Sequence, residues 1–106
     1  MLGLYAGHVS GNYGQSDWTL EDPQVGQRTV TRSVTFPQPF PGMPLILVNL
    51  TGLDAAAGKN LRVRVYPTDV TPAGFNVKFE TWADSIIYGV RASWIAMYVE
   101  YGTVSY

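Results

Sequence analysis

The stretch of residues 74–82 alternates apolar and polar side chains with a period of two. Its apolar members are Phe75, Val77 and Phe79. Because successive side chains of a β-strand point to opposite faces, this period predicts a strand with one buried face. Trp82 ends the strand on the polar side, so we expect an exposed ring there, close to Tyr88.

The rest of the chain repeats this pattern and shows no amphipathic helix. Apolar, β-branched and aromatic residues gather in short segments separated by glycine and proline, a pattern typical of strands. We expect strands at residues 2–9, 29–36, 45–50, 61–66, 74–82 and 88–101. In the fourth, the inward set is Leu61, Val63 and Val65, and the outward set is Arg62, Arg64 and Tyr66. Such strands predict an all-β sandwich or barrel, and 106 residues without an internal repeat predict one domain, residues 1–106.

Glycine, proline and polar residues mark the connections between these strands. Loops or turns are expected at residues 10–27, 37–42, 51–60 and 67–73. Trp18 should pin the first and longest of them to the body of the protein. Arg32 shares the parity of Val30 and Val34, so it must reach an edge, pair internally or occupy a bulge.

The apolar content is high for a chain with so few charges. Hydrophobic residues make up 46% of the chain and charged residues 14%, which argues against disorder. Residues 45–50 and 94–99 are apolar on both parities, so we expect a neighbouring subunit to cover the outer faces of these strands. There is no cysteine, so disulfides cannot stabilise this small domain, and oligomerisation is the expected substitute.

The charge balance excludes two classes of partner. Seven basic and eight acidic residues give a net charge of −1. We therefore expect no nucleic-acid binding, which needs a basic surface, and no attraction to anionic membranes.

No apolar run is long enough for membrane insertion, and residues 1–7 do not resemble a signal peptide. Export without a standard signal, membership of a larger particle and excision from a longer chain all stay open.

The chemistry-bearing residues favour binding over catalysis. One histidine, His8, cannot form a metal cluster without cysteine, and we expect it to be a polar strand or interface residue. The eight acidic residues are scattered as on a solvated surface, and no nucleophile motif or phosphate-binding glycine loop accompanies them. We expect no enzyme activity and no cofactor; Ca²⁺ binding is conceivable but has no support in the sequence.

Two interpretations of the outward-facing arginines Arg62 and Arg64 stay open. They could form ion pairs on a solvated face or a subunit contact. A guanidinium also presents a planar fork of donors that suits sugar hydroxyls, and Trp82 and Tyr88 would supply rings on which the C–H face of a sugar stacks. For Trp82 the alternative is packing at an interface, and Trp94 is expected in the core or an interface.

Several short motifs follow one another between residues 5 and 99. They are Val34-Thr35-Phe36, Pro39-Phe40-Pro41, Pro44-Leu45-Ile46-Leu47-Val48, Leu53-Asp54, Asn60-Leu61-Arg62-Val63, Gly74-Phe75, Thr81-Trp82, Tyr88 and Trp94-Ile95-Ala96. Their order and spacing resemble the H-type lectin domain, the family that includes snail agglutinins and the C-terminal domain of slime-mould discoidins.

The resemblance implies a six-stranded antiparallel β-sandwich that assembles as a homotrimer or a dimer of trimers. It also implies a lectin that binds galactose-type glycans, notably those with N-acetylgalactosamine, in clefts between subunits. The family's binding arginine, tryptophan and tyrosine fall on Arg62, Trp82 and Tyr88. Such a protein would act in glycan recognition and cell adhesion, outside the cell or on the surface of a cell or virion.

Two positions depart from the family's pattern. Histidine commonly follows the tryptophan, and Ala83 stands there in this chain. The loop before the second strand normally offers an acidic residue, and residues 23–27 contain none. Gly26 of this loop and the acids Asp22 and Asp84 complete the expected ligand-binding set. Because a lost charged acceptor removes about 1.5–3 kcal/mol of binding, an alternative stays open: a trimeric structural or host-recognition tip of a phage tail fibre or spike, with little sugar binding.

Overall fold

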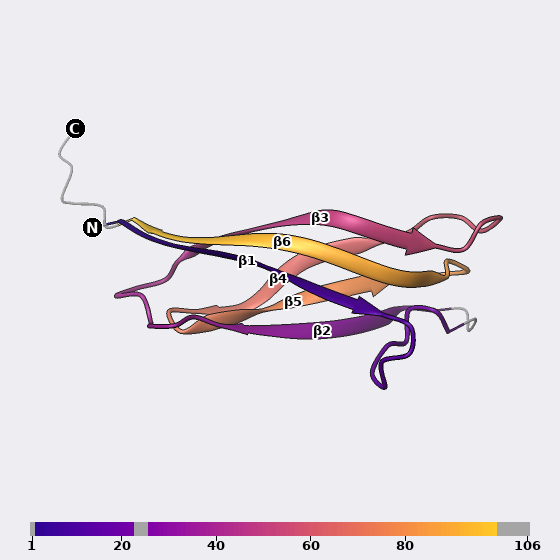
Figure 1. Ribbon diagram of the computed structural model, residues 1–106, viewed down its shortest axis with the longest axis horizontal. Coiled ribbons are helices and arrows are strands. Elements are labelled where there is room, and N and C mark those ends of the chain that lie inside the picture. Colours follow the sequence, from indigo (N-terminus) through magenta and orange to yellow (C-terminus); the bar gives the residue numbers. More distant parts are fainter. Residues whose placement is uncertain (1, 23–25, 100–106) are drawn as a thin grey trace.

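Two three-stranded antiparallel sheets pack face to face to form the molecule (Figure 1). The computed structural model describes residues 2–22 and 26–99. Its strands are β1 (Leu2–Asn12), β2 (Arg28–Thr35), β3 (Leu45–Ala55), β4 (Arg64–Thr71), β5 (Gly74–Thr81) and β6 (Ile87–Val99). One sheet has the order β1-β6-β3 and the other β2-β5-β4. The predicted all-β fold with six antiparallel strands is therefore confirmed. No helix in the described ranges is long and apolar enough to cross a membrane.

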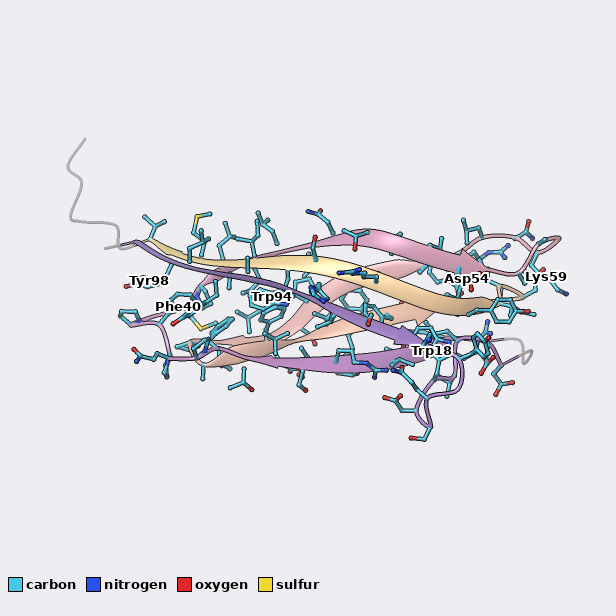
Figure 2. All side chains as sticks on the ribbon, viewed as in Figure 1. Trp18, Phe40, Asp54, Lys59, Trp94 and Tyr98 are labelled. Carbon is cyan, nitrogen blue, oxygen red and sulfur yellow. The ribbon has the colours of Figure 1, made fainter. Side chains whose placement is uncertain are left out.

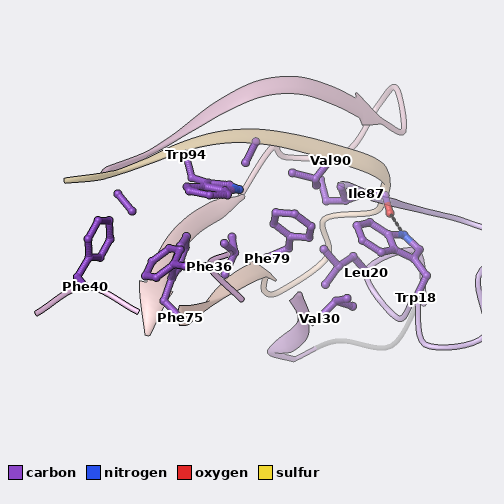
Figure 3. Packing of buried hydrophobic residues seen from close by; sticks show 13 residues of the cluster. Trp18, Leu20, Val30, Phe36, Phe40, Phe75, Phe79, Ile87, Val90 and Trp94 are labelled. Atoms are coloured by element: carbon purple, nitrogen blue, oxygen red, sulfur yellow. Dashed lines mark hydrogen bonds between the residues drawn. The ribbon is translucent and has the colours of Figure 1, made fainter. Parts of the chain in front are cut away.

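The central strands β5 and β6 supply most of the core between the sheets. Phe75, Val77 and Phe79 of β5 are buried, as their alternation predicts. They face Trp94 of β6, whose ring lies 5.3 Å from that of Phe75 (Figure 3). The expectation of Trp94 in the core is confirmed. Phe36 joins this group at the end of β2, so aromatic rings from both sheets interlock.

The long loop expected at residues 10–27 is partly strand, since β1 continues to Asn12. Trp18 pins the remainder, as predicted. Its indole Nε1 donates a hydrogen bond to the carbonyl oxygen of Ile87 at 3.0 Å, and its ring lies 6.2 Å from that of Phe79 (Figure 3). A Cβ on Gly11 would lie 2.4 Å from the indole, so this ring packs directly on the backbone of β1.

Arg32 resolves its unfavourable parity by pairing. Its guanidinium forms an ion pair with the carboxylate of Asp17, and its Nη2 donates to the side chain of Gln15 at 2.8 Å. The Nε atom donates to the carbonyl oxygen of Ser10 at 3.0 Å. Arg32 therefore ties β2 to β1 and to the loop that follows β1.

Two expected connections in the middle of the chain were wrong. The loop expected at 51–60 is strand as far as Ala55, because β3 absorbs a register shift between Leu50 and Gly52 and stays paired with β6. The turn expected at 67–73 is β4 as far as Thr71. Proline lacks an N–H donor, but β4 is an edge strand, which tolerates Pro67.

Leu61 was expected to point inward, and that expectation was also wrong. Strand β4 begins only at Arg64, and Leu61 lies before it with 60% of its surface exposed. Val63 and Val65 do pack against the core, as predicted. The last strand begins at Ile87, and residues 100 and 101 of its expected extent lie outside the described residues.

The outer face of the β1-β6-β3 sheet is apolar along half of its length. Ile46 and Val48 of β3 pack against the core, whereas Leu45 and Leu47, of opposite parity, are 61% and 49% exposed. The exposed large apolar residues on or beside this half are Leu4, Met43, Leu45, Leu47, Ile95 and Val99. The double apolar parity of residues 45–50 thus corresponds to one covered face and one face that is open in a single chain.

Candidate functional site

Three connections meet at one end of the sandwich and carry the candidate residues. They join β1 to β2, β3 to β4 and β5 to β6, and they lie at the right of Figure 1. Figure 2 places Trp18, Asp54 and Lys59 at this end and Tyr98 at the opposite one. We refer to it as the loop end.

Arg62 and Asp84 are joined directly at the loop end. Arg62 Nη1 donates to Asp84 Oδ1 at 2.7 Å, and both side chains are partly exposed. Buried hydroxyls hold the two connections together beside this pair. The Thr81 hydroxyl donates to the carbonyl oxygen of Arg62, and that of Ser85 donates to the carbonyl oxygen of Asn60. The arginine named by the resemblance therefore lies in a fixed segment, with its charge balanced by another candidate residue.

Trp82 follows β5 and keeps 37% of its surface exposed, which confirms its predicted exposure. The guanidinium carbon of Arg64 lies 5.3 Å from the centroid of its ring and 5.5 Å from that of Tyr66. Such contacts between a cation and an aromatic face are favourable. The exposed ring thus has a guanidinium against it that comes from the neighbouring strand β4.

Arg28 connects the other candidate residues, and it was not predicted from the sequence. Its guanidinium donates to three backbone carbonyl oxygens, those of Asp22, Gly26 and Ala83. The β1–β2 connection is thereby attached to the residue that follows Trp82. Arg28 has the inward parity of Val30, and an inward charged residue at the start of a strand is a signal that it must find buried partners.

Ala83 has a left-handed backbone with a φ of 56°. Most residues with a Cβ are disfavoured there; glycine is favoured, and asparagine, aspartate and histidine are the commonest of the others. The turn at Ala83 places Trp82 and Asp84 on either side of the carbonyl that Arg28 binds. The sequence departs from the family's usual histidine at this position, yet the structure retains a conformation that suits such a residue.

Tyr88 lies apart from these residues within a single chain. Its ring contacts that of Tyr13 at 6.0 Å in an edge-on arrangement, and its carbonyl oxygen accepts a hydrogen bond from the Tyr13 N–H at 2.8 Å. A hollow of about 290 Å³ is lined by Tyr13, Asp54 and Tyr88. In the described part of the chain, no hydrogen bond or ring contact joins Tyr88 to Arg62, Trp82 or Asp84.

Glu80 was counted among the acids of a solvated surface, and this was wrong: only 1% of its surface is exposed. Its Oε1 pairs with Arg64. Its Oε2 accepts hydrogen bonds from Gln27, Thr29 and Tyr66 at 2.6, 3.2 and 3.0 Å. The hydrogen bond from Arg64 holds the pKa of the Glu80 carboxyl below its ordinary value of 4.5, although burial acts in the opposite direction. The carboxylate is therefore ionised and fully satisfied at neutral pH.

His8 lies on the outer face of the other sheet, far along the chain from the loop-end candidates. It lines an open hollow of about 450 Å³ together with Thr51, Arg91 and Ser93. Across residues 2–22 and 26–99, no group of three or more histidine, cysteine, aspartate or glutamate side chains is arranged to hold a metal ion. The features of the loop end are those of a binding surface: an exposed ring and guanidinium groups held by carboxylates.

Comparison with known proteins agrees with this interpretation. The model of the H-type lectin domain matches residues 31–97. A discoidin-1 chain of Dictyostelium discoideum is 33% identical over 76 residues, which are 71% of this chain and 30% of that protein. A protein from Fuscovulum blasticum described as ATP synthase subunits region ORF 7 is 39% identical over 84 residues, 79% of this chain and 70% of that one.

The fold also matches solved structures. Wild-type discoidin II from Dictyostelium discoideum superposes with a TM-score of 0.80 at 24% identity, covering 94% of this chain and 38% of that one. The tailspike gp61 of Pseudomonas phage phi297 superposes with a TM-score of 0.56 at 14% identity, covering 89% of this chain and 15% of that one. This chain thus spans well under half of the length of the discoidins that it matches. With the family model covering residues 31–97 and the sandwich in place, the chain belongs to the H-type lectin domain family.

Proposed function

We propose that this protein is a lectin whose loop end binds glycans of the galactose and N-acetylgalactosamine type and performs no chemistry on them. The observation that carries this proposal is the exposed Trp82 ring, which has the Arg64 guanidinium against it, in a domain of the H-type lectin family whose loop end also holds the Arg62–Asp84 pair. In such a site, the C–H face of a sugar stacks on the indole. The hydroxyls of the sugar accept hydrogen bonds from Arg62 and donate hydrogen bonds to Asp84 and to neighbouring carbonyl groups.

The electrostatics of the loop end favour an uncharged sugar. Arg62 is balanced by Asp84 and Arg64 by Glu80, so neither guanidinium offers an uncompensated positive charge to an acidic glycan. The candidates Asp22 and Gly26 are held on the same end through Arg28. Because residues 23–27 lack the family's acidic acceptor, we expect single-site affinity to be lower by about 1.5–3 kcal/mol.

Weak sites become effective when several of them act together. We propose that the apolar outer face of the β1-β6-β3 sheet joins chains into a homotrimer, or a dimer of trimers. Exposed leucines such as Leu45 and Leu47 support this, since a monomer rarely leaves so large an apolar patch open. In such an assembly, Tyr88 would meet a neighbour's Trp82 at a cleft between subunits. Three sites can raise avidity by about 10²–10⁴ over one site.

Light scattering at micromolar concentration tests the assembly. It should give three or six times the 11.7 kDa mass of the chain. A monomer mass would contradict this part of the proposal and would leave Tyr88 away from the site. The protein would act outside the cell or on a cell or virion surface, with glycans as partners and without a resident cofactor, nucleic acid or inserted membrane segment.

The second candidate is a trimeric structural or host-recognition tip of a phage tail fibre or spike. Its support is the apolar outer face together with a fold shared with a phage tailspike. In this role the outer face would drive assembly, and sugar binding would be slight.

A glycan array separates the two candidates. The unaltered protein is compared with Arg62→Ala, at concentrations where both have the same oligomeric mass. Binding to galactose- or N-acetylgalactosamine-bearing glycans that Arg62→Ala loses supports the lectin. An absence of binding to every glycan on the array would favour the tip.

A further inference from the structure

Arg64 is held in place more firmly than a surface arginine usually is. Its Nε and Nη2 atoms both bond to Oε1 of Glu80, and that carboxylate is in turn fixed by three donors from β2, from the segment before it and from β4. A guanidinium with two donors bound and two rings against it loses most of its rotational freedom. The entropy cost of ordering Arg64 is therefore met before any ligand arrives.

The same arrangement leaves part of Arg64 available. About 59% of its side chain is exposed. Among the described residues, its Nη1 atom has no hydrogen-bond partner. A guanidinium has five N–H donors, so Arg64 keeps several unused ones beside the exposed indole of Trp82, whose ring centroid lies 5.3 Å from its guanidinium carbon.

Arg62 does not duplicate this arrangement. It pairs with Asp84, whose side chain is about half exposed, and no cation–ring contact involves it in the described part of the chain. The arginine that the resemblance assigns to the ligand and the arginine that packs on the exposed ring are therefore different residues, two positions apart.

We propose that Arg64 contacts the ligand directly beside Trp82 and that Glu80 is its positioning residue. This inference rests on the proposed glycan site and adds two residues to it. Glu80, being buried, does not touch the ligand; it fixes the plane of Arg64, which holds the indole and presents Nη1 to a sugar hydroxyl. The Glu80–Arg64–Trp82 unit is thus a preformed half of the site that lies within one protomer.

Arg64→Lys is the decisive variant because it separates two roles. Lysine keeps a positive charge opposite Glu80, so the buried carboxylate stays paired and the fold is retained. It lacks the flat guanidinium face and the forked donors. Arg32→Lys is the matched control, since Arg32 is also paired to a carboxylate but packs toward β1. Affinity for N-acetylgalactosamine, or for the best glycan from an array if that differs, is measured calorimetrically on the full chain.

The expected result is a loss of affinity of about tenfold or more for Arg64→Lys, the loss typical of a charged hydrogen bond. Arg32→Lys should change affinity less than about twofold. Glu80→Gln should lower affinity too. The double variant that combines Arg64→Lys with Glu80→Gln should bind no worse than Arg64→Lys alone, because Glu80 acts through Arg64.

Wild-type affinity in Arg64→Lys would overturn the inference while leaving the lectin proposal standing. Additive losses in the double variant would overturn the positioning role of Glu80. If the unaltered protein binds no glycan at all, both the proposed function and this inference fail. Should Glu80→Gln fail to fold, the comparison of Arg64→Lys with Arg32→Lys still decides whether Arg64 touches the ligand.

Discussion

Replacing Trp18 with phenylalanine removes a single anchor of the loop end. The indole N–H donates to the carbonyl oxygen of Ile87 at 3.0 Å, and both residues are buried. Phenylalanine cannot donate, so this carbonyl loses a buried partner, which costs about 1–3 kcal/mol. The smaller ring also leaves space over Gly11 and against Phe79, which adds about 1 kcal/mol or more. We expect the free energy of unfolding to fall by about 2–4 kcal/mol.

Urea denaturation at one fixed protein concentration measures this change, since assembly would make stability depend on concentration. Trp82→Phe is the matched control. Trp82 is 37% exposed and donates no hydrogen bond to another described residue, so the same chemical change there should cost less than about 1 kcal/mol. An equal or larger loss for Trp82→Phe than for Trp18→Phe would refute the assignment of Trp18 as the anchor.

Three further substitutions, at Glu80, Ala83 and Gly74, have expected outcomes. Arg64 lowers the pKa of Glu80 below 4.5, so the stability that this ionised carboxylate contributes is present above about pH 4.5 and is lost as the pH falls through its lower folded pKa. Thermal melts from pH 6 to 3 should therefore show a steeper loss of stability for the unaltered protein than for Glu80→Gln. Parallel curves for the two proteins would contradict this. Ala83→Gly should raise the free energy of unfolding by about 0.5–1 kcal/mol, because glycine adopts a φ of 56° without strain. If urea titrations showed a destabilised variant, the left-handed backbone conformation of Ala83 would be contradicted. Gly74→Ala should lower the free energy of unfolding by more than about 2 kcal/mol or prevent folding, since its Cβ would lie 2.2 Å from the backbone oxygen of Val34. A variant as stable as the unaltered protein would show that β2 and β5 do not approach so closely.

Local alternation was sufficient to predict the central strand β5. Phe75, Val77 and Phe79 are buried and Trp82 is exposed, as a period of two requires. The extents of the other strands were harder to predict, because propensity opposes tertiary pairing there. Proline and aspartate are poor strand residues, yet β4 keeps Pro67 on a sheet edge and β3 continues past a bulge to stay paired with β6.

The candidate site was predictable only in part. The resemblance named Trp82 and Arg62, and both lie at the loop end with Asp84, which was expected only as a substitute for the family's missing acid. The roles of Glu80 and Arg28 depend on partners more than 50 residues away in the chain, such as Thr29 for Glu80 and Ala83 for Arg28. A single sequence shows that a charged residue exists, but it does not show which distant groups surround it.

The arrangement of the two sheets suggests a division of labour between them. The outer face of β1-β6-β3 carries exposed leucines such as Leu45 and Leu47, whereas the outer face of β2-β5-β4 carries Glu80 and Arg64. An assembly through the first face would leave the second face and the loop end accessible to glycans. Multivalent binding needs this separation, because chains must associate without covering their sites.

The surface around Trp82 is where we propose that the glycan binds. We would test it by recording amide and indole N–H signals of the isotope-labelled protein by NMR while adding N-acetylgalactosamine. We expect the indole signal of Trp82 and the amide signals of Ala83 and Asp84 to shift together in a saturable way, while the indole signals of the buried Trp18 and Trp94 stay in place. Saturable shifts confined to other surfaces, or no shifts at concentrations up to tens of millimolar, would contradict it.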